Sequence, residues 1–193
     1  SGYHQKIIAQ ADQMAVLVND LLELSKIQAG PLVLKPENVD LYDLVSDAIA
    51  DLDPVAQQRN IAVDGSAEQT TLATADAASL ARAVRNLLLN AIVYTRRNTT
   101  VRILAHADGP DAVIAVEDEC GGIPVEHLDE VFTAGWHERA GRPGNAYSGA
   151  GVGLSLVSGI AGAHGGTVGV ANVGNGCCFT LRIPGPAATA GRG

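Results

Sequence analysis

The sequence predicts an α/β two-layer sandwich, in which a mixed β-sheet carries helices on one face and is preceded by one long helix. Helical and strand-like patterns alternate along the chain after residue 40. The last two strand-like segments are separated only by Gly174-Asn175-Gly176, a turn signal, so they should pair as a hairpin. The chain is 47% hydrophobic and only 4% aromatic, so we expect a core of Ala, Val, Leu and Ile.

The first part of the chain predicts one long helix, from about His4 to Gln28. Its apolar residues recur near heptad spacing, and Gly30-Pro31 ends the pattern. These apolar residues are Ile7, Met14, Leu17, Leu21 and Leu24. One amphipathic helix cannot bury such a stripe alone, so partner helices are expected from another copy or from residues upstream.

Two later segments predict core helices that begin with acidic N-caps. Asp40 precedes a helix that should extend to about Arg59, with Pro54 kinking or dividing it. Asp76 precedes a second helix, whose apolar residues recur at helical spacing. They are Leu80, Val84, Leu87, Leu88 and Ala91.

The remaining elements follow from alternation, turn signals and apolar runs. Strands are expected at 61–64, 71–74, 100–107, 112–117, 167–172 and 177–183. Short helices are expected at 125–131 and 154–163. Residues 133–148 are rich in glycine and polar residues without periodicity, which predicts a mobile loop.

Composition excludes several classes of function. The net charge of −8 argues against a broad nucleic-acid surface. No lysine follows Lys35, which excludes a Walker A loop and the strand lysine of protein kinases. Three cysteines provide neither a disulfide framework nor a zinc set. No apolar run reaches the ~18 residues of a membrane span and no secretory signal opens the chain. We therefore expect a cytoplasmic protein, or the cytoplasmic part of a membrane-bound one, with no membrane contact within these residues.

Asn86 and Asn90 are four residues apart, so their carboxamides lie on one face of the predicted helix. A carboxamide oxygen is a hard, uncharged ligand, which suits magnesium or a site beside phosphates. Two satisfied polar side chains at a helix edge are the alternative.

Asp118 follows a predicted strand and precedes Gly121 and Gly122. An Asp in this position can accept a hydrogen bond from an exocyclic amine, while the glycines let a flat ring approach the backbone. An ordinary Asp-Gly turn would leave the same pattern.

Gly149-Ala150-Gly151-Val152-Gly153-Leu154 leads into a predicted helix, whose N-terminal amides can hold phosphates. A tight loop-to-helix junction is the structural alternative. A dinucleotide fingerprint is excluded because Leu154 stands where its third glycine is required.

In their order and spacing, these segments together resemble the ATP-binding domain of bacterial sensor histidine kinases. The segments Asn86–Ala91, Asp118–Ile123, Phe132 and Gly149–Leu154 resemble that family's N, G1, F and G2 boxes. Residues 21–30 look like the end of its second dimerisation helix. The resemblance implies a Bergerat fold, which binds ATP beneath a flexible lid.

The resemblance also implies which residues would hold Mg·ATP. Asn90 would be the Mg²⁺ ligand, and Asn86 would support the phosphate side. Asp118 would bind the adenine amino group, with Gly122 and Ile123 lining the base. The phosphate-binding residues would be Gly149, Gly151, Val152, Gly153 and Leu154.

The chain departs from the family pattern at several positions. Cys120 stands where the G1 box usually has glycine, and Val93 replaces a common lysine or arginine. The F box lacks its usual second phenylalanine, so Trp136 either packs in its place or serves as a surface anchor. Residues 133–148 would be the lid.

The implied activity is that of a histidine kinase, an ATP:protein-histidine phosphotransferase. Its phosphoacceptor histidine has no counterpart in these 193 residues, and we identify no general base. The expected partners are a response regulator and, through the dimerisation helices, a second copy of the protein. A non-enzymatic nucleotide-binding or dimerising module is the alternative. An ATP-hydrolysing relative is less favoured, because the Asn86 carboxamide cannot act as a base on water.

We therefore expect four regions. Residues 1–30 would be the partial dimerisation region, 31–38 a linker, 39–185 the ATP-binding catalytic domain and 186–193 a disordered tail.

Overall fold

The computed structural model describes residues 14, 18, 21, 22, 25, 30, 33–67, 71–136 and 151–186. Residues 14, 18, 21, 22 and 25 are helical, as the heptad pattern predicts. The rest of the expected long helix lies outside the described residues. No helix in the described ranges combines the length and apolarity needed to cross a membrane.

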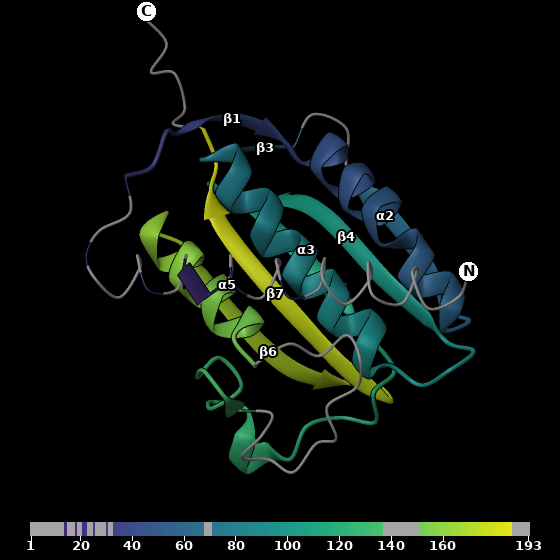
Figure 1. The fold of residues 1–193 in the computed structure, drawn as a ribbon. Coiled ribbons are helices and arrows are strands. Elements are labelled where there is room, and N and C mark those ends of the chain that lie inside the picture. The colour runs from purple at the N-terminus through teal and green to yellow at the C-terminus, as the bar shows by residue number, and fades with distance from the viewer. Residues whose placement is uncertain are drawn as a thin grey trace, which may run out of the picture.

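Among the described residues, the larger sheet has five strands in the order β2-β4-β5-β7-β6, and Figure 1 labels β4, β7 and β6 of this sheet. Its strands are β2 (Ala62–Ala67), β4 (Thr100–Asp108), β5 (Asp111–Glu117), β6 (Thr167–Val173) and β7 (Gly176–Pro184). β2 pairs with β4 in parallel and the other pairs are antiparallel, so the sheet is mixed, as expected. β1 (Glu37–Asp40) and β3 (Leu72–Ala75) form a separate antiparallel pair.

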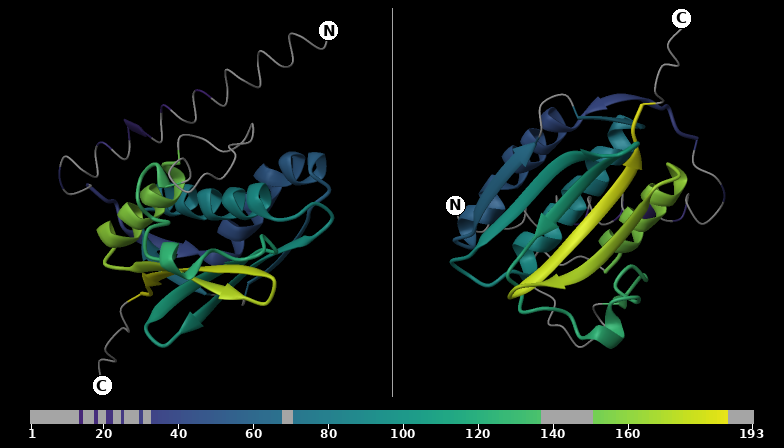
Figure 2. Two further views of the ribbon diagram at one scale, coloured as in Figure 1. Left: turned by 90° about the horizontal axis from the view of Figure 1, so that it is seen from below. Right: turned by 180° about the vertical axis from the view of Figure 1, so that it is seen from behind.

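In the part of the chain that the structure describes, three helices cover one face of this sheet, which confirms the predicted two-layer fold (Figure 2). They are α2 (Leu41–Gln58), α3 (Ala77–Tyr94) and α5 (Gly153–Ala163). Their apolar stripes and the inward side chains of the strands form one core, in which Ala, Val, Leu and Ile predominate. α3 lies between α2 and α5 across the middle of the sheet, so its residues contact both neighbours (Figure 1).

Three local expectations differ from the structure. Pro54 does not divide α2, because it lies on the exposed side where the carbonyl that loses its partner faces water. β1 begins at Glu37, inside the expected linker; its ENVD sequence has no strand-like alternation and depends on pairing with β3. Residues 125–131 form only a 3₁₀ turn, η1 (Val125–His127), because the backbone bonds there connect residues three apart rather than four.

Both predicted N-caps are confirmed. The Asp40 carboxylate accepts a hydrogen bond from the Tyr42 amide at 2.8 Å. Asp76 accepts one from the Ser79 amide at 2.9 Å and a second from the Lys35 amide at 3.1 Å. Asp76 therefore joins the start of α3 to the segment that precedes β1.

The Asp76 cap predicts a pH-dependent stability. The amide hydrogen bonds from Ser79, and then from Lys35, hold the pKa of its carboxyl below the ordinary value of 3.8. Because this pKa is lower in the folded state, the stabilisation is complete above the unfolded pKa and is lost as pH falls through the folded pKa. We expect Asp76→Ala to lower the free energy of unfolding by about 1 kcal/mol at pH 7, with screening of the partly exposed carboxyl limiting the effect.

Urea unfolding at pH 7 and below pH 3.8 measures this difference. The difference in free energy of unfolding between Asp76→Ala and the parent should narrow in acid, where neither protein has a negative charge at residue 76. Asp76→Asn is the control, because it keeps an oxygen acceptor for the Ser79 amide without the ionisation. An unchanged difference in acid would show that the carboxylate charge contributes nothing.

Candidate functional site

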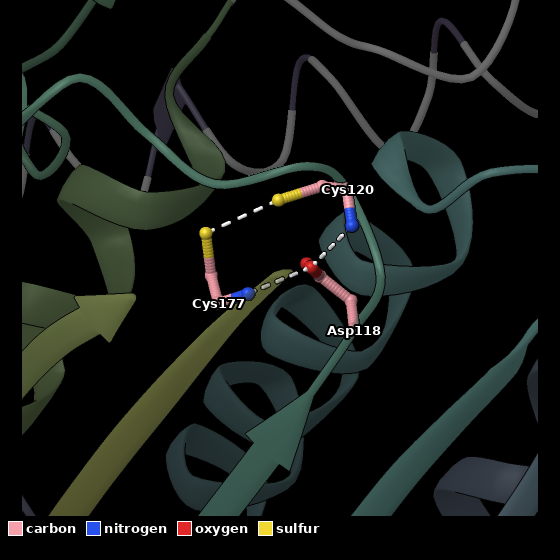
Figure 3. A group of neighbouring side chains, drawn as sticks. All are labelled: Asp118, Cys120 and Cys177. Carbon is pink, nitrogen blue, oxygen red and sulfur yellow. Dashed lines mark hydrogen bonds between the residues drawn. The ribbon is translucent and has the colours of Figure 1, made fainter. Parts of the chain in front are cut away.

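Asp118 lies just beyond the end of β5 and is held by the first residues of β7. Its amide donates to the Cys177 carbonyl at 3.0 Å. Its Oδ1 accepts from the amides of Cys120 at 2.9 Å and Cys177 at 3.2 Å (Figure 3). The residue is only 7% exposed. Both bonds use the same oxygen, so they orient the carboxylate without using Oδ2.

The loop after Asp118 depends on two glycines. Gly121 and Gly122 have φ values of 93° and 90°, a region that side chains rarely adopt. A Cβ at Gly122 would lie 3.3 Å from Oδ1 of Asn172, and one at Gly121 would lie 3.0 Å from the Arg96 guanidinium. Gly121 is exposed and Gly122 is half-buried, and both positions lack a side chain that would cover the backbone.

Asn172 of β6 supports this loop in a way that the sequence analysis missed. Its Oδ1 accepts from the Ile123 amide and its Nδ2 donates to the Ile123 carbonyl, both at 2.8 Å. The carboxamide therefore pairs with Ile123 as a neighbouring strand would, and Ile123 is buried. Nothing in the sequence distinguishes Asn172 from an ordinary residue at the end of a strand.

A second missed residue, Thr95, connects the Asp118 loop to α3. Its Oγ1 accepts a hydrogen bond from the Glu119 amide at 3.1 Å. Thr95 is the C-cap of α3, and its side chain is buried. The loop therefore meets α3 at the end of the helix that carries the two asparagines.

Asn86 and Asn90 lie on consecutive turns of α3, in different environments. Asn86 is 8% exposed, and its Nδ2 has no hydrogen-bond partner among the described residues. Asn90 is half-buried. A buried amide donor without a partner is costly, so Asn86 differs from the satisfied polar pair that was the structural alternative.

The start of α5 lies against Asn86. A Cβ at Gly153 would be 3.8 Å from both Cγ and Oδ1 of that asparagine. Val152 is the N-cap of α5, and no side chain among the described residues caps this end. Gly151 has a φ of 69°, and its carbonyl accepts from the Gly135 amide at 3.2 Å. Among the described residues, no side chain therefore accepts a hydrogen bond from the first-turn amides of α5.

The structure therefore brings most of the predicted residues together along α3. Gly153 meets its middle, at Asn86, and the loop after Asp118 meets its end, at Thr95. Val152 and Leu154 are buried beside the start of α5. Gly149 and most of the predicted lid lie outside the described residues.

The aromatic residues of the expected F box pack inward. Phe132 contacts Phe179 edge to face, with ring centroids 6.2 Å apart. Trp136 is 2% exposed, and its ring lies 6.3 Å from that of His127. Trp136 is thus a packing residue, and the alternative of a surface anchor is wrong.

Comparison with known proteins places this fold and these segments in a family. Residues 75–187 match the family described as "Histidine kinase-, DNA gyrase B-, and HSP90-like ATPase". The chain belongs to this ATPase family. The match spans both asparagines, Asp118 and the start of α5, so the resemblance seen in the sequence is confirmed.

Sensor kinases are among the curated relatives of this family member. The chain is 32% identical over 183 residues to the sensor-like histidine kinase SenX3 of Mycobacterium tuberculosis, covering 94% of this chain and 44% of SenX3. It is 33% identical over 181 residues to the sensor histidine kinase MtrB of the same species, covering 92% of this chain and 31% of MtrB. The chain thus spans less than half the length of these curated relatives.

Solved protein structures are also similar to this chain. Full-length ShkA in complex with AMPPNP has a TM-score of 0.81 and 26% identity, and the match covers 98% of this chain and 39% of ShkA. The Acinetobacter baumannii histidine kinase AdeS has a TM-score of 0.77 and covers 95% of this chain and 84% of its own. AdeS is 23% identical, so this second likeness concerns the fold alone.

Proposed function

We propose that this chain is the ATP-binding catalytic part of a sensor histidine kinase, which positions Mg·ATP for transfer of its γ-phosphoryl group to a histidine on a dimerisation helix. The observation that carries the proposal is the buried Asn86 amide, which has no partner among the described residues and lies against the uncapped start of α5. A phosphate oxygen would satisfy both the amide and the helix terminus.

Different residues would contact the base and the phosphates of the nucleotide. Oδ2 of Asp118 would accept a hydrogen bond from the adenine amino group, because Oδ1 is already held by two amides. Gly122 and Ile123 would line the base. The phosphates would contact Asn86 and the backbone amides around the start of α5, namely those of Gly149, Gly151, Val152, Gly153 and Leu154.

The donor set also fits a magnesium ion. Asn90 offers a half-exposed carboxamide oxygen, a hard ligand of the kind that Mg²⁺ accepts beside phosphates. When bound, Mg²⁺ would neutralise charge on the triphosphate. The chain itself would orient the nucleotide rather than supply a base, because Asn86 carries an amide where hydrolysis would need a proton acceptor.

The relatives' names extend the proposal beyond this chain. Because SenX3 and MtrB are sensor kinases, we propose that the phosphoryl group passes on to a response regulator and that the whole protein works as a homodimer. Residues 39–185 would be the catalytic domain, 1–30 part of the dimerisation region, 31–38 the linker and 186–193 the tail. The described apolar residues of the first helix, such as Met14 and Leu22, are exposed, which supports a partner there.

Calorimetric titration tests the nucleotide site. Mg·ATP should bind the intact chain more tightly than Mg·GTP does. Asn90→Ala should weaken Mg·ATP binding at least tenfold, about 1.4 kcal/mol, and remove the difference between titrations with and without Mg²⁺. The loss should fall on the Mg²⁺-dependent part of the affinity, because the variant keeps every backbone contact.

Arg85→Ala is the matched control for Asn90→Ala. Arg85 is on the same helix but faces α2, where it pairs with Asp51 at 3.4 Å. This variant should bind Mg·ATP like the parent. Absence of ATP binding in the folded, intact chain would refute the proposed function.

A further inference from the structure

We propose that Cys120 and Cys177 are a redox-modification site, at which a hydroperoxide forms an intramolecular disulfide that weakens adenine-nucleotide binding. The second half of this proposal rests on the proposed function, whereas formation of the disulfide does not.

The two sulfur atoms are already neighbours. Their Sγ atoms are 3.1 Å apart, although the residues are 57 positions apart in the sequence. Cys120 lies in the loop after β5 and Cys177 lies in β7, and the side chains point toward each other (Figure 3). A disulfide requires about 2.05 Å between the sulfurs, so an approach of roughly 1 Å is sufficient.

Their environments give them different roles in oxidation. Cys120 is half-buried, whereas Cys177 is 1% exposed. The hydrogen bond from the Cys177 thiol lowers the pKa of Cys120, which increases its thiolate fraction. Cys120 is therefore the sulfur that meets an oxidant, and Cys177 is the resolving partner beneath it.

The reaction balances with the hydroperoxide as the two-electron oxidant. The Cys120 thiol first loses its proton to solvent, and the thiolate attacks the outer peroxide oxygen as the O–O bond breaks. Cys120 becomes a sulfenic acid, and the departing alkoxide or hydroxide takes a proton from solvent to leave as an alcohol or water. The Cys177 sulfur then attacks the Cys120 sulfur. The S–O bond breaks as the S–S bond forms, and the departing hydroxide takes the Cys177 proton to leave as water.

Two thiols and a carboxylate could instead bind a metal ion. The ligand atoms of Asp118, Cys120 and Cys177 lie within 4.8 Å of one another. Two thiolates on one zinc ion, each at ~2.3 Å in a tetrahedral arrangement, would be ~3.8 Å apart. The observed separation of 3.1 Å is shorter, and Oδ1 of Asp118 already accepts two amide hydrogen bonds. The geometry therefore favours a disulfide.

The disulfide would act on Asp118 through the backbone. The two amides that hold Oδ1 of Asp118 belong to the same two cysteines. Drawing their sulfurs together displaces at least one of these amides and turns the carboxylate. Because a hydrogen bond weakens steeply with misalignment, we expect the dissociation constant for ATP to rise at least fivefold.

Cys178 provides an internal control. It follows Cys177 in β7, so its side chain lies on the opposite face of the sheet, where its Sγ is 3.8 Å from the Thr180 hydroxyl. Burial raises the pKa of Cys178, which makes it less reactive.

The test uses the full chain, reduced and freed of metal with EDTA, then treated with hydrogen peroxide. Alkylation followed by peptide mass mapping should find Cys120 joined to Cys177, with a loss of two hydrogens, and Cys178 alkylated. The ATP dissociation constant, measured afterwards with added Mg²⁺, should rise at least fivefold and return after dithiothreitol.

Variants identify the sulfurs responsible. Cys178→Ser should respond like the parent, whereas Cys177→Ser should show no peroxide-dependent change in ATP affinity. Cys120→Ser, at a half-buried position, makes the same test if Cys177→Ser folds poorly. Continued alkylation of Cys120 and Cys177 after peroxide, or a response that persists in Cys120→Ser, would overturn the disulfide.

Two further outcomes separate this inference from the proposed function. A disulfide that forms without changing the ATP affinity of a binding-competent protein overturns the second half of the inference. A disulfide in a chain that binds no ATP when reduced supports the modification site and refutes the proposed function instead.

Discussion

Asp118→Asn is expected to weaken ATP binding about 100-fold, or about 2.8 kcal/mol, while the fold stays intact. The Asn Oδ1 can still accept from the amides of Cys120 and Cys177, so the loop keeps its two supports. The NH₂ group must then take the place of Oδ2. It would present a donor to the adenine amino group, itself a donor, and remove a charge-assisted hydrogen bond.

The same variant should change nucleotide preference. A purine with a carbonyl at position 6 offers an acceptor to the new NH₂ group, so the ratio of ATP to ITP affinity should fall or reverse. Calorimetry with both nucleotides measures this ratio, and thermal unfolding should show a melting temperature close to that of the parent. Equal loss of affinity for ATP and ITP would contradict a direct contact between Asp118 and the base.

Gly176→Ala is expected to destabilise the fold by about 3 kcal/mol or more, at the upper end for overpacking. A Cβ at Gly176 would overlap the Asp118 carbonyl oxygen and lie 2.8 Å from the Glu119 Cα. These atoms belong to the backbone and cannot rotate away. β7 and the loop after β5 must therefore separate, which also displaces the Asp118 carboxylate.

Thermal and urea unfolding measure this loss, which corresponds to a fall in melting temperature on the order of 10 °C. Gly169→Ala is the control, because Gly169 lies in neighbouring β6 and a Cβ there would meet nothing within 4 Å. It should leave stability nearly unchanged. A Gly176→Ala protein as stable as Gly169→Ala would show that the β5–β7 junction can open without cost.

Elements with strong local signals were predictable from the sequence. The caps at Asp40 and Asp76, the helices that follow them, and the hairpin at Gly174–Gly176 agree with the structure. Each depends on hydrogen bonds and side-chain periodicity within a few residues, which the sequence displays directly. β1 was missed because its strand conformation depends on β3, whose paired residues lie more than thirty positions along the chain.

The residues of the candidate site also divide into those with a local sequence signal and those that depend on distant contacts. Asparagine and glycine spacing indicated Asn86, Asn90, Asp118 and the segment before α5, because these residues belong to short local motifs. Asn172 and Thr95 gave no such signal, since each supports the site through a contact with a distant segment.

By itself, the sequence determined the α/β class, most helices and strands, and the family to which the chain belongs. Only the tertiary structure decided the strand order, the burial of the unpartnered Asn86 amide, the inward packing of Trp136 and the meeting of Cys120 with Cys177. The physical reason is the sequence separation over which each kind of interaction acts. Local propensities act over a few residues, whereas contacts such as the one across 57 positions arise only when sheet pairing brings the segments together.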